Sequence, residues 1–155
     1  MKLCGDTVTV FNARVDPQTG DDRWWPTVIR GVSWHATDAS AVDAARGGLV
    51  AANRCTVRIP AEVDTGGKTF VDAIAYRDAA DADGLWTLEG GTILVKAEVP
   101  EPAPSEAADA DDPGRQPGGW TPAALRRAFA DCVTALAVTD NRRAPRGGHW
   151  KVVGT

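Results

Sequence analysis

Short stretches in which apolar and polar residues alternate recur along the chain, a pattern that predicts β-strands. The first covers residues 6–12 (DTVTVFN), where Val8 and Val10 are separated by threonine. The second covers residues 25–35 (WPTVIRGVSWH). Strict alternation there places Val28, Arg30, Val32 and Trp34 on one face and Ile29, Ser33 and His35 on the other. Gly31 in the middle of this strand predicts a bulge or bend.

A third strand is predicted at residues 55–60 (CTVRIP), with Val57 and Ile59 pointing inward and Pro60 ending the strand. Before it, residues 36–53 are small and polar and contain Gly47-Gly48. This segment is equally compatible with a short helix and with a long hairpin. After it, a turn is predicted at residues 64–67 and a weaker extended segment at residues 69–75.

The following segment has the pattern of a β-hairpin. Its predicted strands are residues 85–88 (LWTL) and 92–99 (TILVKAEV), joined by a turn at Gly90-Gly91. A second hairpin is predicted at the end of the chain, from residues 133–139 and 149–153. Its loop, residues 140–148, carries Arg142, Arg143 and Arg146.

One amphipathic helix of about three turns is predicted at residues 121–131. Thr121 is a suitable N-cap before Pro122, and Leu125, Phe129 and Cys132 follow at helical spacing. Six or seven short strands with one short helix predict a mainly β fold, either a small antiparallel β-barrel or a sandwich with long loops. The length of 155 residues predicts that residues 1–155 form a single β domain.

Residues 100–119 (PEPAPSEAADADDPGRQPGG) interrupt this pattern with an acidic, Pro-, Ala- and Gly-rich sequence that has almost no large apolar residue. We expect an exposed loop that faces solvent or a DNA channel, or one that has no role, and that folding does not require. Its acidic residues outnumber its single basic residue, Arg115, so the segment would repel a phosphate backbone. These acidic residues are Glu101, Glu106, Asp109, Asp111 and Asp112.

Composition and charge narrow the classes of protein that fit. Hydrophobic residues make up 43% and charged residues 25%, an ordinary globular balance. We expect no membrane partner, because no apolar run approaches the ~18 residues of a membrane span, and no signal peptide. A net charge of −4 argues against wrapping nucleic acid over the whole surface, although it leaves room for a local basic patch. Cys4, Cys55 and Cys132 are widely spaced, which favours free thiols over a disulfide framework.

Catalytic chemistry has no recognisable signature in this sequence. Phosphate-binding, dinucleotide-binding, nucleophile-elbow and zinc-protease motifs are absent, so we predict no catalytic residue, no cofactor and no metal. His35 and His149 would hold a metal only if the fold brought them together with a Cys or Asp. The cysteines fit buried apolar positions better than nucleophiles.

Tryptophans and arginines are the candidates for interface residues. Trp24, Trp25 and Trp120 flank loops, where they either pack at the edge of the core or anchor a protein partner. Arg142, Arg143 and Arg146 are either solvated loop charges or contacts to a neighbouring subunit or to phosphate.

The order of these segments resembles a family of small prophage proteins encoded among head and neck genes. The segments that carry the resemblance are VTVFN, TVIRGVSWH, TVRIP, WTLEGGTILVKAEV and WTPAALRRAFADCVTALAVTDNRRAPRGGHWKVVG, of which TDNRR and HWKVVG are the most specific. The arrangement resembles more weakly the head-completion "stopper" proteins, or minor capsid proteins, of long-tailed bacteriophages. Those proteins usually carry an acidic residue after the glycine of the hairpin turn, where this chain has Gly91-Thr92.

The resemblance implies a non-enzymatic structural protein of the virion neck, present in the host cytoplasm before assembly. It implies a homo-oligomeric ring, six- or twelve-fold, between the portal-adaptor complex and the tail, which conducts or retains DNA with at most non-specific contact. A tail-terminator or other tail-completion protein is an alternative of the same class. Two other classes are a nucleic-acid-binding small barrel, with a face made by Arg142, Arg143, Lys151 and Trp150, and a metal-dependent enzyme.

Overall fold

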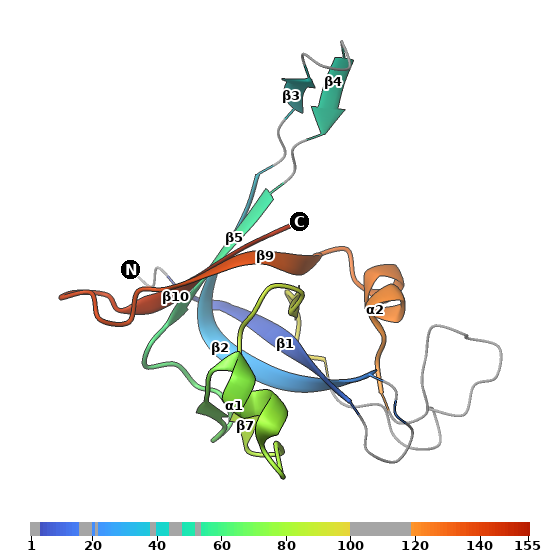
Figure 1. The fold of residues 1–155 in the computed structure, drawn as a ribbon. Coiled ribbons are helices and arrows are strands. Elements are labelled where there is room, and N and C mark those ends of the chain that lie inside the picture. Colours follow the sequence, from blue (N-terminus) through green and yellow to red (C-terminus); the bar gives the residue numbers. More distant parts are fainter. Residues whose placement is uncertain are drawn as a thin grey trace.

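The chain folds into a closed antiparallel β-barrel. The structure, a computed structural model, describes residues 4–15, 20, 22–37, 40–43, 48–51, 54–99 and 119–155. Six strands follow one another around the barrel in the order β1–β2–β5–β10–β9–β8 (Figure 1). They are β1 (Asp6–Val15), β2 (Asp22–Thr37), β5 (Arg54–Pro60), β8 (Ile93–Val95), β9 (Cys132–Asp140) and β10 (His149–Gly154). The predicted mainly β fold is therefore confirmed, as a barrel of six strands.

Six shorter elements complete the described part of the chain. Two small sheets are formed by β3 (Ser40–Asp43) with β4 (Gly48–Ala51) and by β6 (Thr69–Phe70) with β7 (Leu85–Trp86). The helices are α1 (Ala73–Asp78) and α2 (Pro122–Ala128), so the described residues contain two helices where the sequence predicted one. Neither is long and apolar enough to cross a membrane.

Alternating side chains of the strands fill the barrel. On β5, Cys55, Val57 and Ile59 point inward and are nearly inaccessible to solvent, as the sequence predicted for the last two. They pack against Val8 and Val10 of β1, as part of one apolar cluster. The predicted hairpin at the end of the chain is also confirmed, because β9 pairs with β10 from Ala135 to Asp140, with one register shift.

Gly31 changes the inward face of β2. Thr7 pairs with Arg30 and Asp6 with Val32, so Gly31 is an extra residue in the strand, and its φ of +93° suits glycine. One extra residue reverses the alternation, and both Ile29 and Val32 are therefore completely buried in the barrel. The bulge prediction is confirmed, whereas the assignment of Ile29 and Val32 to opposite faces is wrong.

A second apolar cluster lies outside the barrel wall, under α2. Leu125 of this helix packs with Phe11 of β1 and with Ile93 and Val95 of β8. Thr121 caps the helix by accepting a hydrogen bond from the Ala124 amide, as predicted. The helix is shorter than predicted, because Phe129 already has extended backbone and Cys132 begins β9.

Two predictions for residues 69–99 need correction. The segment predicted as extended at residues 69–75 begins as β6 but turns into α1 at Ala73, since Asp72 accepts a hydrogen bond from the Ala75 amide and caps the helix. Residues 85–88 and 92–99 do not pair with each other. Instead β7 pairs in parallel with β6, and β8 pairs with β1 and β9. Local alternation does not encode the partner of a strand, and here both partners of β8 are distant in sequence.

The structure describes part of residues 36–53 but almost none of residues 100–119, the two long segments between predicted strands. Residues 40–43 and 48–51 pair as the antiparallel strands β3 and β4, which settles the choice between helix and hairpin for those parts of residues 36–53. In Figure 1 this hairpin projects beyond the ends of β2 and β5, away from the barrel. The acidic segment, with Glu101, Glu106, Asp109, Asp111 and Asp112, lies outside the described residues apart from Gly119.

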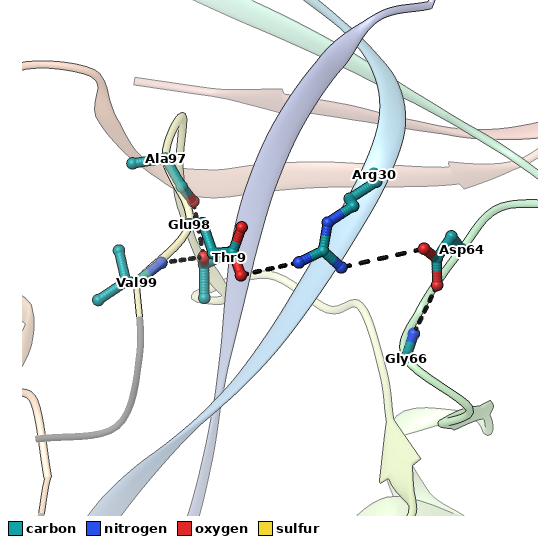
Figure 2. Close-up of polar contacts among 7 residues, drawn as sticks. All are labelled: Thr9, Arg30, Asp64, Gly66, Ala97, Glu98 and Val99. Carbon is teal, nitrogen blue, oxygen red and sulfur yellow. Dashed lines mark hydrogen bonds and ion pairs between the residues drawn. The ribbon is translucent and has the colours of Figure 1, made fainter. Parts of the chain in front are cut away.

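Residues 96–99 cross the outside of β1 and are fixed there by one buried hydroxyl. The Thr9 hydroxyl donates a hydrogen bond to the Ala97 carbonyl (2.7 Å) and accepts one from the Val99 amide (2.9 Å). Figure 2 shows Arg30 beside this contact, with its guanidinium between Glu98 (2.7 Å) and Asp64 (3.9 Å). These two ion pairs are exposed, so their contribution to stability is small.

Candidate functional site

The barrel wall is incomplete on one side of β9. β8 has only three residues, and it pairs with residues 132–134 of β9. Ala135 still exchanges hydrogen bonds with the loop before β8, because its amide bonds to Thr92 and its carbonyl accepts from Gly91 (both 2.8 Å). Beyond it, residues 137–140 of β9 pair with β10 on one side only, and Leu136 lies at a register shift, where it has no paired residue on β10. We call these five residues the open edge.

The segment between β6 and β8 fills most of the gap that the short β8 leaves. Asn12 of β1 holds it, since its amide nitrogen donates to the Thr87 carbonyl (2.8 Å) and its oxygen accepts from the Thr87 amide (3.1 Å). Arg14 holds α1 by stacking over the Tyr76 ring and bonding to the Ala79 carbonyl. Burial raises the pKa of Tyr76 to about 12, with Arg14 lowering it and Asp83 raising it.

A groove remains between the open edge and the β6–α1 segment, with a volume of about 650 Å³. Leu136 and Val138 line its β9 side, and Ala73 and Ala75 line its α1 side. Leu136 is 61% exposed, which is unusual for a leucine in a barrel strand. Phe70, Leu88 and Trp150 also line the groove and belong to the core or pack against it.

Three aromatic rings meet beside this groove. The centroids of Phe70, Trp86 and Trp150 lie 4.6 to 5.3 Å from one another. Trp150 is 3% exposed, and its indole Nε1–H has no acceptor among the described residues. Most buried polar groups in proteins have a partner, so this donor is an exception.

Arg142, predicted as a contact residue, is held by side chains of its own chain. Its guanidinium stacks over Phe70 (4.9 Å) and Trp150 (4.8 Å) and donates hydrogen bonds to both carboxylate oxygens of Asp140. Side-chain and backbone hydrogen bonds from Arg142 lower the pKa of Asp140 to about 2, with a smaller charge effect from Arg142 and Arg143. The loop closes tightly around this arginine, because a Cβ on Gly148 would lie 2.5 Å from the Arg142 carbonyl oxygen.

The other predicted interface residues are dispersed. Arg143 and Arg146 are exposed in the same loop as Arg142. Trp24 packs against the cluster under α2 and pairs with Trp120 across an isolated bridge, whereas Trp25 stacks under Arg23 at 4.2 Å. The fold therefore does not bring the two tryptophans and the three arginines into one site.

The residues considered for nucleic-acid binding do not form an accessible stacking face. Trp150 is buried, and Asp140 neutralises Arg142 locally. A base needs an exposed ring to stack on. Trp150 therefore cannot fill the role that this hypothesis gives it.

The cysteines and histidines do not assemble a reactive centre in the described part of the chain. His35 pairs with Thr56 and His149 with Pro60, four positions apart along β5. No three Cys, His, Asp or Glu side chains among the described residues are grouped to hold a metal. Burial raises the pKa of Cys55 to about 11, aided by Asp131 and opposed by Lys96, and burial also raises that of Cys132.

The residues that shape the groove were missed by the sequence analysis. Asn12 and Phe70 carry no motif, and Leu136 looks like any apolar strand residue. The one usable signal was Asp72 before AIAY, a helix N-cap that would have placed α1.

Together these features define a small closed β-barrel protein with a projecting hairpin and an open strand edge. The chain belongs to the family described as "Family of unknown function (DUF6751)", which it matches over residues 3–155. No curated protein and no solved structure matches it.

Proposed function

We propose that this protein is a structural subunit of the neck of a long-tailed phage, where copies of it assemble into a ring between the portal-adaptor complex and the tail. The ring conducts or retains the packaged DNA without chemistry. The phage context rests on the resemblance carried by TDNRR and HWKVVG. A tail-terminator role differs only in the neighbours that the ring contacts.

The observation that carries the assembly role is the projecting hairpin β3–β4. It extends away from a barrel that already closes on itself (Figure 1). A hairpin that stands beyond the ends of β2 and β5 is well placed to contact another molecule. Loops and hairpins on a rigid β scaffold commonly make the contacts between subunits.

Disruption of the gene in the phage or prophage that carries it tests the neck role. We expect heads that lose their DNA or fail to attach tails. Light scattering of the purified protein, with imaging of its assemblies with and without the portal, tests ring formation. Complete, DNA-filled and tailed particles from the disrupted gene would overturn the neck assignment.

A further inference from the structure

The open edge of β9 lacks a partner strand in the described structure, and so does each outer edge of the β3–β4 hairpin, which, like β6–β7, forms a sheet of only two strands. Unpaired edges carry N–H and C=O groups that readily accept another strand. The two edges are comparable in length, because β3 and β4 have 4 residues each and the open edge covers residues 136–140.

The register of β9 shows which backbone groups are available. Asn141 and His149 exchange backbone hydrogen bonds (2.9 and 3.4 Å), and the pairs Thr139–Lys151 and Ala137–Val153 continue this ladder. Bonding alternates between the two sides of an antiparallel strand, so the amide and carbonyl groups of Val138 and Asp140 point away from β10. Val138 and Asp140 line the groove, and among the described residues no strand pairs with them on that side.

The groove also offers side-chain contacts to an added strand. Leu136, 61% exposed, stands at its β9 side, with Phe70 and Leu88 nearby. An extended segment supplies backbone carbonyls as acceptors and alternate apolar side chains, which is the chemistry of recognition by strand addition.

The β3–β4 hairpin, for its part, lacks a third strand to stabilise it. A two-stranded hairpin is marginally stable at best without further packing. Its sequences, SAVD and GLVA, contain strand-forming and apolar residues. In Figure 1 it lies at the opposite end of the molecule from α1, which borders the groove, so the hairpin cannot reach the groove of its own chain.

We propose that the β3–β4 hairpin of one copy adds one of its outer strands to the open edge of β9 in a second copy. The contact is head-to-tail, because hairpin and groove are different surfaces, and repetition of such a contact closes into a ring when the rotation allows it. The inference rests on the proposed function in requiring self-assembly, and it specifies the two surfaces that join.

Two variants remove one surface each. Leu136→Asp places a charge in the groove at an exposed position, and the matched control Val15→Asp makes the same change at a residue of β1 that is 62% exposed. The second variant lacks the hairpin: a two-residue Asn-Gly turn replaces residues 38–53, since Thr37 and Arg54 are already paired across β2 and β5. Circular dichroism and thermal denaturation establish that each variant is folded.

Light scattering then measures the mass of each protein and of mixtures. We expect the wild type and Val15→Asp to assemble, and each of the two surface variants to need about tenfold or more concentration to do so. A mixture of the two surface variants should give a 1:1 dimer, because one supplies only the hairpin and the other only the groove. Assembly of Leu136→Asp like the wild type, or a mixture without dimers, would overturn the docking alone. A wild type that stays monomeric at every concentration would overturn the proposed function as well.

Discussion

Replacement of threonine by valine at two buried positions should change the stability in opposite directions. Thr9 is 0% and Thr87 is 1% exposed, so the same chemical change occurs in two equally dry environments. The Thr9 hydroxyl bonds to the backbone of Ala97 and Val99 (Figure 2), whereas the Thr87 hydroxyl has no hydrogen-bond partner in the described structure.

The expected magnitudes follow from these contacts. Thr9→Val leaves the Ala97 carbonyl and the Val99 amide without their partner, and each buried unsatisfied group costs about 1–3 kcal/mol. We expect a loss of about 2–4 kcal/mol in the free energy of unfolding. Thr87→Val removes a hydroxyl that is buried without compensation, which should add about 1 kcal/mol. In a chain of this length, about 1 kcal/mol shifts Tm by roughly 2–4 °C.

Urea denaturation at fixed pH, followed by circular dichroism, measures both changes. The two variants should have the same m-value as the wild type, so that the shift of the midpoint reports stability alone. Equal losses in the two variants would refute the reasoning, because they would show that loss of the hydroxyl itself, and not of its hydrogen bonds, sets the cost.

Two further predictions concern single ionisable groups. The Asp140 carboxyl should titrate near pH 2 by NMR, and Arg142→Gln should return its pKa toward 3.8, since Arg142 supplies the largest stabilising contacts. Because folding lowers the pKa of Asp140, its ionised carboxylate adds a small amount of stability above about pH 4, and this contribution is lost as the pH falls toward 2. Titration of Asp140 near pH 3.8 in the wild type would contradict the pairing with Arg142. Cys55, with a pKa of about 11, should resist iodoacetamide at pH 8 until the protein unfolds, whereas the less buried Cys4 should react. Mass spectrometry of the labelled protein measures the extent of reaction at each cysteine. Rapid labelling of Cys55 in the folded protein would show that the barrel opens.

The sequence by itself determined most of the barrel strands and the bulge. The alternation in residues 55–60 fixed the inward face of β5, because side chains of a strand project to opposite faces in turn. Thr121-Pro122 likewise marked the start of α2, since an N-cap and an N1 proline act within a single turn. These are local effects, which local sequence is able to encode.

Only the tertiary structure decided which strands pair and where the barrel wall stays open. Asn12 hydrogen-bonds to Thr87, 75 positions away in the sequence, and holds residues 85–88 where they do not form the hairpin that their alternation predicted. The sequence left Arg142 open as a solvated loop charge or as a contact to a neighbour, whereas in the folded chain it contacts Asp140, Phe70 and Trp150. The open edge arises because β8 is shorter than β9, and the local sequences of these two strands do not determine how many residues pair. Such contacts depend on the relative positions of distant segments, and those positions exist only in the folded chain.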